Sequence, residues 1–236
     1  MVAEVMYQKV FMDLPFYRQE KYWKQLGVPF PRETAANWFN TCALEYLEPV
    51  YQLLHKRLLE REVIHADEVP CQVLHEEGKD ASSKSYIWVY LTGTDSLPKI
   101  VLYDYKPGRS GAYLAEFLKG FHGMLYCDGY QGYNRVEDVT RLCCLAHCRR
   151  KFYEALPAER RRKLKLLDIH SSESVPELPE SIEDNPHMLP AEKGLAFCNQ
   201  LFFLEQLYKE LPSEERKAKR LEKEPDVWNR FWVWLE

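Results

Sequence analysis

Two acidic residues, Asp67 and Asp128, each follow a short apolar run, at residues 63–66 and 124–127. An acid that ends a buried strand is held by rigid backbone, and two such acids converge at the sheet edge if their strands are neighbours. Converging carboxylates repel one another unless a cation neutralises them, and oxygen ligands suit Mg²⁺ or Mn²⁺. The pattern predicts a site for two ions, as in two-metal phosphoryl transfer. A structural alternative stays open, in which both acids are only turn residues, because Asp128-Gly129 is a common turn pair.

Cys144 and His147 form a Cys-x-x-His pair, which Cys143 and Cys148 could extend to four zinc ligands. Adjacent residues on a strand point to opposite faces, so Cys143 and Cys144 would not converge on one ion. We therefore do not expect zinc. His147 could instead orient a carboxylate or contact a phosphate, or it could simply be a hydrogen-bonded residue that opens a helix.

Basic residues are concentrated in one part of the chain, although its net charge is −4. Arg149, Arg150 and Lys151 begin a predicted helix, and five more basic residues follow up to Lys165. Such a cluster near a phosphodiester site would bind DNA phosphates without reading the base sequence. The alternative is an ordinary solvated helix face.

The elements that must position these residues are five predicted strands with a helix between the third and the fourth. The third strand reaches the fourth through this helix, which Ser110 caps, and such a crossover favours parallel pairing. The order of elements is that of a ribonuclease H-like domain, so we expect a mixed α/β (α+β) fold with a five-stranded mixed sheet. The predicted strands are residues 63–66, 86–91, 99–105, 124–127 and 142–145.

Helical patterns flank the predicted sheet. Before it, Gly27 ends one helix and Arg32 begins the next, which Pro49 kinks or restarts. The segment Phe16 to Asn40 could be a helix-turn-helix that reads DNA, or simply two packed amphipathic helices. After it, we expect Ser213 to cap a helix that Pro225 interrupts. The predicted domains are a helical module (1–61), a partial ribonuclease H-like catalytic core (62–168), a linker (169–190) and the start of a helical insertion (191–236).

The composition is that of a globular protein, with 236 residues of which 46% are hydrophobic. Seven cysteines, an odd number, argue against a disulfide framework. The chain has no apolar run of about 18 residues and no signal peptide at its start, so we expect a cytoplasmic protein without membrane contact.

Five stretches of the sequence, in this order and spacing, resemble the IS66 family of insertion-sequence transposases. They are Leu14-Pro15-Phe16-Tyr17-Arg18-Gln19; His65-Ala66-Asp67-Glu68 with Gln72-Val73-Leu74; Tyr86-Ile87-Trp88-Val89-Tyr90; Asp128-Gly129-Tyr130 with Gly132-Tyr133-Asn134; and Cys144-Leu145-Ala146-His147 with Arg149-Arg150-Lys151-Phe152. The resemblance implies a DDE-type DNA transposase in which Asp67 and Asp128 are the first two catalytic carboxylates and bind two Mg²⁺ or Mn²⁺ ions. It also implies element ends and target DNA as partners, a homo-oligomer on DNA, and Cys144 and His147 as support to the active site.

The sequence departs from the family pattern in one important respect. The third acidic residue is expected in an Asn-Asn-x-x-Glu-Arg motif, which the chain lacks, and Glu154 and Glu205 are weak substitutes. If the chain is a truncated copy, it would be a catalytically inactive DNA-binding or regulatory fragment. A further alternative is a non-enzymatic scaffold whose interface is the tryptophan-rich end of the chain. We expect this end either to pack back on the body or to be covered by a continuation of the chain, and we favour the second.

Overall fold

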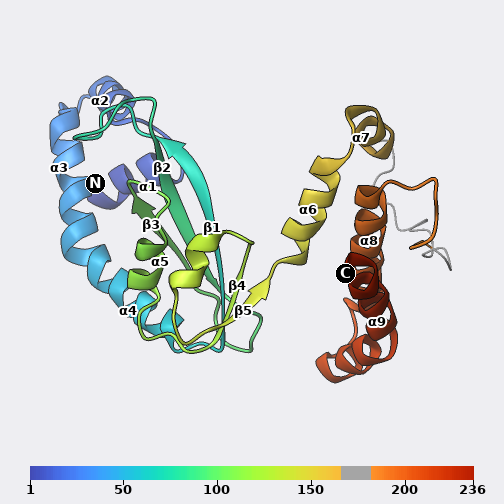
Figure 1. The fold of residues 1–236 in the computed structure, drawn as a ribbon. Coiled ribbons are helices and arrows are strands. Elements are labelled where there is room, and N and C mark those ends of the chain that lie inside the picture. Colours follow the sequence, from blue (N-terminus) through green and yellow to red (C-terminus); the bar gives the residue numbers. More distant parts are fainter. Residues whose placement is uncertain (166–181) are drawn as a thin grey trace. The chain divides into compact units, whose positions relative to one another are not determined.

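The computed structural model describes residues 1–165 and 182–236, which form two compact units (Figure 1). The first unit contains Met1–Leu125 and Asn134–Thr140, and the second contains Tyr126–Tyr133 and Arg141–Glu236. The domain boundaries expected from the sequence stay a prediction. Most of the expected linker, residues 169–181, lies outside the described residues.

The first unit begins with helices that end and restart where the sequence predicted. Gly27 has a φ of 76°, a conformation that glycine adopts without strain, and it follows α2. Pro49 lies in the first turn of α4, where its missing N–H is harmless, after a π-helical turn. The elements are α1 (Val2–Val10), α2 (Phe16–Gln25), α3 (Arg32–Cys42), the π-helical η1 (Ala43–Leu47) and α4 (Glu48–Leu59). Helix α1 was not among the predicted elements.

The sheet has the predicted five strands, in the order β3-β2-β1-β4-β5. Strand β2 pairs antiparallel with both β1 and β3. Strands β4 and β5 run in the same direction, because Thr140 N donates to Gly123 O and Cys144 N to Cys127 O. The mixed sheet is confirmed, and its order is compatible with a ribonuclease H-like core. The strands are β1 (Val63–Gln72), β2 (Lys84–Thr92), β3 (Val101–Lys106), β4 (Met124–Cys127) and β5 (Thr140–Cys143).

Strand β1 is much longer than predicted, and Asp67 lies within it and not at its end. Its second half pairs with β2, from Asp67 opposite Val89 to Gln72 opposite Lys84. The neighbour on the other side, β4, has only four residues, against ten in β1. The later part of β1 therefore extends past β4, and Pro70, which cannot donate a backbone hydrogen bond, is tolerated there.

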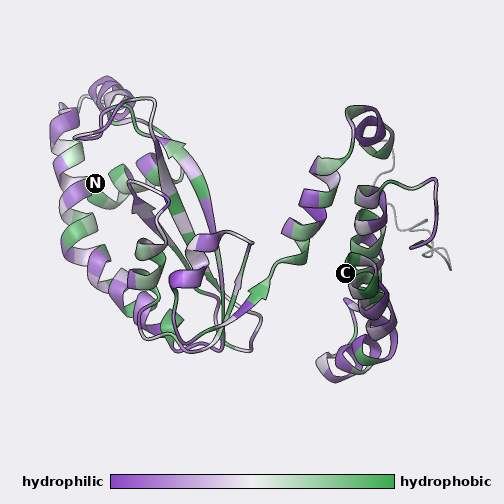
Figure 2. Ribbon diagram, viewed as in Figure 1, coloured by the Kyte–Doolittle hydropathy of each residue, from purple (hydrophilic) through white to green (hydrophobic). Residues whose placement is uncertain are grey.

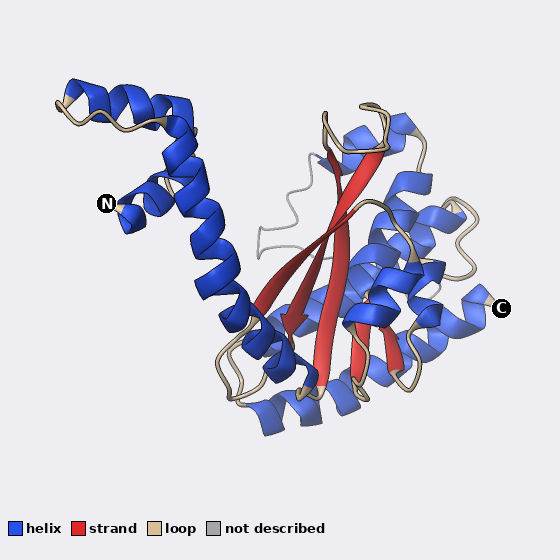
Figure 3. Cartoon of the chain, turned by 90° about the vertical axis from the view of Figure 1, so that its left-hand side faces the viewer, coloured by secondary structure: helices blue, strands red, loops and turns tan. Residues whose placement is uncertain are grey.

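One face of the sheet forms the core of the first unit. Burial alternates along the first half of β1 and the second half of β2, where Ile64, Trp88 and Tyr90 are fully buried. Hydrophobic and hydrophilic residues are mixed along these strands (Figure 2). Helix α5 (Gly111–Phe117), which Ser110 caps as predicted, places Phe117 parallel to the Tyr90 ring at 3.7 Å between centroids. Helix α4 lies alongside the sheet (Figure 3). Each large apolar side chain buried in this way stabilises the fold by about 1.5–3 kcal/mol.

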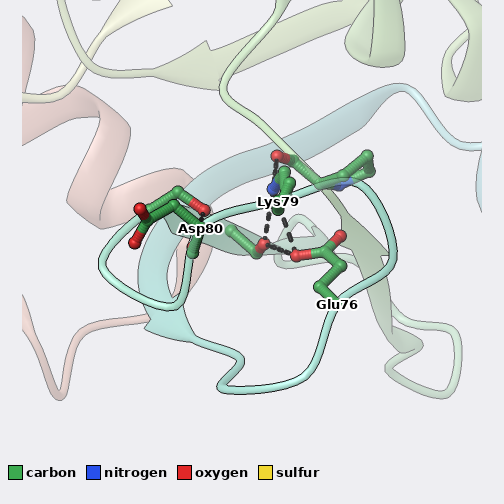
Figure 4. A network of polar contacts seen from close by, with 6 residues as sticks. Glu76, Lys79 and Asp80 are labelled. Atoms are coloured by element: carbon green, nitrogen blue, oxygen red, sulfur yellow. Dashed lines mark hydrogen bonds and ion pairs between the residues drawn. The ribbon is translucent and has the colours of Figure 1, made fainter.

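The connection between β1 and β2 is held by a polar network around Lys79 (Figure 4). The Lys79 ammonium donates to Glu76 Oε2 at 3.1 Å, to Ser85 Oγ at 2.8 Å and to the carbonyl of Pro107. Ser85 is fully buried and donates to Glu76 at 2.5 Å, which lowers the pKa of the Glu76 carboxyl. This network ties the start of β2 to the segment after β3.

The second unit is built on two long helices, α8 (Pro190–Tyr208) and α9 (Ser213–Leu235), with α6 (Leu145–Ala155) and α7 (Ala158–Lys165) before them. Its core is apolar and consists of Ile182, Phe197, Leu201, Leu204, Tyr208, Val227 and Phe231. Phe152 of α6 and Trp234 of α9 pack against this core, whereas Trp232 and Leu235 are half exposed. The tryptophan-rich end therefore packs back in part.

Two predictions about α9 were wrong. Pro225 does not interrupt the helix, and Ser213 is its first residue and not a side-chain cap. Contacts on both sides of Pro225 hold α9: Arg220 binds Glu205 of α8, and Phe231 is in the core. These contacts offset the roughly 3 kcal/mol cost of an interior proline.

We expect Gly194→Ala to destabilise the second unit by up to about 2 kcal/mol. A Cβ at Gly194 would lie 2.4 Å from Cε1 of Phe152, whose ring is itself in contact with Phe231 and Trp234. Overpacking of about 1–3 kcal/mol should exceed the gain in helix propensity of about 1 kcal/mol. Urea unfolding followed by circular dichroism measures the effect. The double variant with Phe152→Leu should recover part of the loss; unchanged stability of the single variant would contradict the close approach.

Glu224 of α9 has a pKa raised by burial and by the neighbouring Glu205, which Arg220 holds ionised. The folded state therefore favours the protonated Glu224, so its contribution to stability falls as pH rises from the ordinary carboxyl pKa through the raised one. Glu224→Gln should raise the melting temperature at pH 7 by about 1–2 °C, a small shift because solvent screens the half-exposed group. Melting curves at pH 5 and 7 test this. Glu222→Gln, on the same helix but with a lowered pKa, should give no increase.

Candidate metal site and nucleic-acid interface

Asp67 is exposed on the face of β1 opposite to the one that buries Ile64 and Ala66. Its Oδ1 atom accepts a hydrogen bond from the backbone amide of Glu68 at 2.9 Å. Burial lowers the pKa of His65, two residues earlier on the same face, which favours a neutral imidazole at pH 7. The long antiparallel pairing with β2 gives the Asp67 carboxylate a rigid base, as the strand-borne position predicted.

Asp128 follows β4 directly and is half-buried. Its Oδ1 atom accepts from the amide of Tyr130 at 2.8 Å, which fixes the turn. The residues after it are tightly packed: a Cβ at Gly132 would lie 2.1 Å from the Tyr130 ring, and Tyr133 meets that ring edge-on at 6.1 Å. This close approach explains why glycine and two tyrosines occur at this spacing after the acid.

The strands that carry the two acids begin next to one another. Strand β4 is the neighbour of β1 in the sheet, and Met124 N donates to Glu62 O at 2.8 Å. Asp67 belongs to the first unit and Asp128 to the second. The shared metal site stays a prediction. Residues 1–165 and 182–236 contain no group of three or more His, Cys, Asp or Glu side chains arranged for a metal ion.

An ion pair that was not predicted lies beside Asp67 in the chain. Glu68 points to the core face, where its side chain is 2% exposed, and Arg109 Nε donates to its Oε1 at 2.6 Å. The second guanidinium contact is made by Nη2. The partners are 41 residues apart, so no local pattern could have revealed them. Glu68 is thus occupied in holding β1 and is not a candidate ligand.

Cys144 and His147 lie at the start of α6. Cys144 was predicted on a strand, but β5 ends at Cys143, and Cys144 is the residue before the helix, with its amide bonded to Cys127 O at 2.8 Å. Burial raises the pKa of Cys148, and it raises that of its neighbour Cys198 to about 12. These thiols stay protonated at neutral pH, which disfavours thiolate ligation. The supporting role of Cys144 and His147 stays a prediction.

The predicted DNA-binding residues of α6 differ in their contacts. Arg149 Nε donates to Asn199 Oδ1 of α8 at 2.6 Å, so this side chain is used inside the unit. Arg150 is exposed, and Lys151 is exposed with Glu154 at 3.8 Å.

Glu205, one of the two substitutes considered for the third acid, is bound by two nitrogens of the Arg220 guanidinium. Neither Glu154 nor Glu205 thereby gains support as a third metal ligand.

The whole chain, residues 1–236, matches the model of the family described as Transposase IS66 family. The chain belongs to this family. The resemblance found from the five sequence stretches is confirmed. None of the helices that the structure describes combines the length and hydropathy that a membrane span requires.

Relatives of this IS66 family chain occur in Sinorhizobium fredii (strain NBRC 101917 / NGR234). The uncharacterized protein y4qI is 31% identical over 170 residues, 65% of this chain and 31% of the relative. The uncharacterized protein y4hP is 24% identical over 246 aligned positions, 100% of this chain and 41% of the relative. The chain thus spans less than half the length of these relatives. No solved structure matches it.

Proposed function

We propose that this IS66 family chain is the core of a DNA transposase that cleaves and joins DNA strands with two divalent metal ions. Asp67 and Asp128 would hold the ions, Mg²⁺ or Mn²⁺, because both donors are carboxylate oxygens. When bound, the two ions would activate the attacking water or 3′-hydroxyl and stabilise the leaving oxygen. DNA ends and target DNA are the proposed substrates, bound by an assembled homo-oligomer.

The order of the strands carries this proposal. Asp67 is the fourth residue after Val63, and Asp128 is the fourth after Met124, the two residues that open β1 and β4. The two strands are neighbours in the sheet and begin side by side, since Met124 N donates to Glu62 O. Within each strand burial follows the same count, since Ile64 and Leu125 are fully buried and Ala66 and Cys127 nearly so.

The residues around the acids have positioning roles in this scheme. The amide of Glu68 orients the Asp67 carboxylate, and the amide of Tyr130 orients that of Asp128. Each bond holds one oxygen of its carboxylate on rigid backbone. Two carboxylates held in fixed directions require little reorganisation when a cation binds, which is the arrangement that phosphoryl transfer needs.

A cleavage assay tests the proposal. It uses a longer protein that contains this chain together with the expected third acidic residue. Labelled duplexes that contain the element ends should be nicked with Mg²⁺ or Mn²⁺ and left intact with a chelator. Cleavage that continues in the chelator would overturn the metal mechanism. DNA binding without cleavage under any of these conditions would favour the alternative, an inactive DNA-binding or regulatory protein.

A further inference from the structure

A hollow of about 220 Å³ lies in the second unit where α6 meets α7, lined by Tyr153, Ala158, Arg161 and Arg162. Tyr153 and Arg161 are half-buried, and Arg162 is exposed. Two arginine side chains and one tyrosine thus border the same small space, mainly through their carbon atoms. Guanidinium groups recognise phosphate through paired charge-assisted hydrogen bonds.

The charges of these two arginines are not neutralised within the part of the chain that the structure describes. No ion pair there joins either Arg161 or Arg162 to a carboxylate, and Nε of Arg161 is buried without a hydrogen-bond acceptor. The nearest acids in sequence do not supply a carboxylate partner. Glu154 lies by Lys151, and among the described residues Glu159 forms no ion pair with Arg161 or Arg162. A buried donor without an acceptor is costly, so the Arg161 guanidinium favours an anionic ligand with acceptor oxygens.

The neighbouring basic residues differ in this respect. Arg160 lies 3.4 Å from Glu192, and Arg149 is bound to Asn199. Both therefore contribute to the packing of α6 and α7 on α8. Arg161 and Arg162 have no such role among the described residues, although they belong to the same basic segment.

We infer that Tyr153, Arg161 and Arg162 form a binding site for the DNA backbone, with a phosphate on the two guanidinium groups and the adjoining sugar or base against the Tyr153 ring. This rests on the proposed function, since it assumes that DNA is the partner. It moves the main phosphate contact from the start of α6, where Arg149 is already engaged, to the junction of α6 and α7. Aromatic rings tolerate any base, so the site binds without reading sequence.

Fluorescence anisotropy with the full chain tests the site, using a labelled single-stranded oligonucleotide and the same sequence as a duplex. The double variant Arg161→Gln with Arg162→Gln should weaken binding about tenfold or more, as expected for a lost charge-assisted contact. It should also reduce the slope of log affinity against log salt by about 1.4 for the single strand and about 1.8 for the duplex, because two charge contacts are removed. Arg161→Lys with Arg162→Lys should restore the slope and part of the affinity.

The matched control removes two basic residues elsewhere. Lys219 and Lys223 of α9 are 48% and 55% exposed, and Lys219→Gln with Lys223→Gln changes the net charge equally. Equal losses in the two double variants, with unchanged melting temperatures, would overturn the site but leave DNA binding intact. If the unaltered chain binds neither oligonucleotide, both the site and the proposed function are overturned. Tyr153→Ala should weaken the binding of the single strand more than that of the duplex, since only unpaired bases can stack on the ring.

Discussion

Asp67→Asn and Asp128→Asn are each expected to reduce Mg²⁺-dependent cleavage of element ends by more than about a hundredfold. Replacing residues that only support a metal ligand typically costs about 10–100-fold, and loss of a ligand itself should exceed that. Asparagine keeps the shape of the side chain and one oxygen, but it removes the negative charge that balances the cations. The rate of strand cleavage is measured for each variant of the longer protein at several Mg²⁺ concentrations.

Asp226→Asn is the control for this pair, because Asp226 is an exposed residue of α9 outside the proposed metal site. Its cleavage rate should equal that of the unaltered protein. Both catalytic variants should keep their melting temperature and their DNA affinity in the absence of metal. Cleavage at an unchanged rate in either of them would reject the assignment of the two carboxylates.

Arg109→Met is expected to destabilise the first unit by about 1–3 kcal/mol. The Glu68 side chain is almost completely buried, and Arg109, which is itself 40% exposed, contacts it through two nitrogens. Removing the arginine deprives a buried carboxylate of a charged hydrogen-bond partner, which costs about 1–3 kcal/mol. Hydrogen exchange of the β1 and β2 amides measures the effect within this unit, since their protection should fall by about one to two orders of magnitude.

Two further variants separate the buried charge from simple loss of an arginine. Arg57→Met removes a side chain that is 63% exposed and paired with Glu60 on the surface, so it should cost about 0–1 kcal/mol. The double variant Glu68→Gln with Arg109→Met should recover much of the stability, because the buried charge is gone. If Arg109→Met matches Arg57→Met, the Glu68 contact does not stabilise the fold.

The local elements were largely predictable, because each depends on a few consecutive residues. Strand β4 has the predicted bounds, and Ser110 caps α5 as expected, with its Oγ accepting from Ala112 N at 3.3 Å. Gly27 follows α2, where a positive φ is needed. Apolar side chains, a capping hydroxyl and a glycine act over one or two turns of chain, so they can be recognised in a single sequence.

Element lengths were less predictable, because they depend on pairing between distant segments. Strand β1 continues to Gln72 since β2 offers it a partner over nine residues, despite the polar Asp67 and Glu68 and the proline at position 70. Helix α9 continues through Pro225 because Arg220 and Phe231 are held by partners on both sides of it. In each case the energy of tertiary contacts exceeds the local preference.

The candidates for chemistry could be recognised from the sequence alone, since Asp67 and Asp128 stand next to strand-forming runs and within stretches that resemble one transposase family. Which charged residues are already bound to a partner became clear from the fold. The fold pairs Glu68 with Arg109, Arg149 with Asn199 and Glu205 with Arg220, and it leaves Arg161 and Arg162 at a hollow. The charge of a side chain follows from one position of the sequence, but its partner and its burial depend on residues that folding brings from far along the chain.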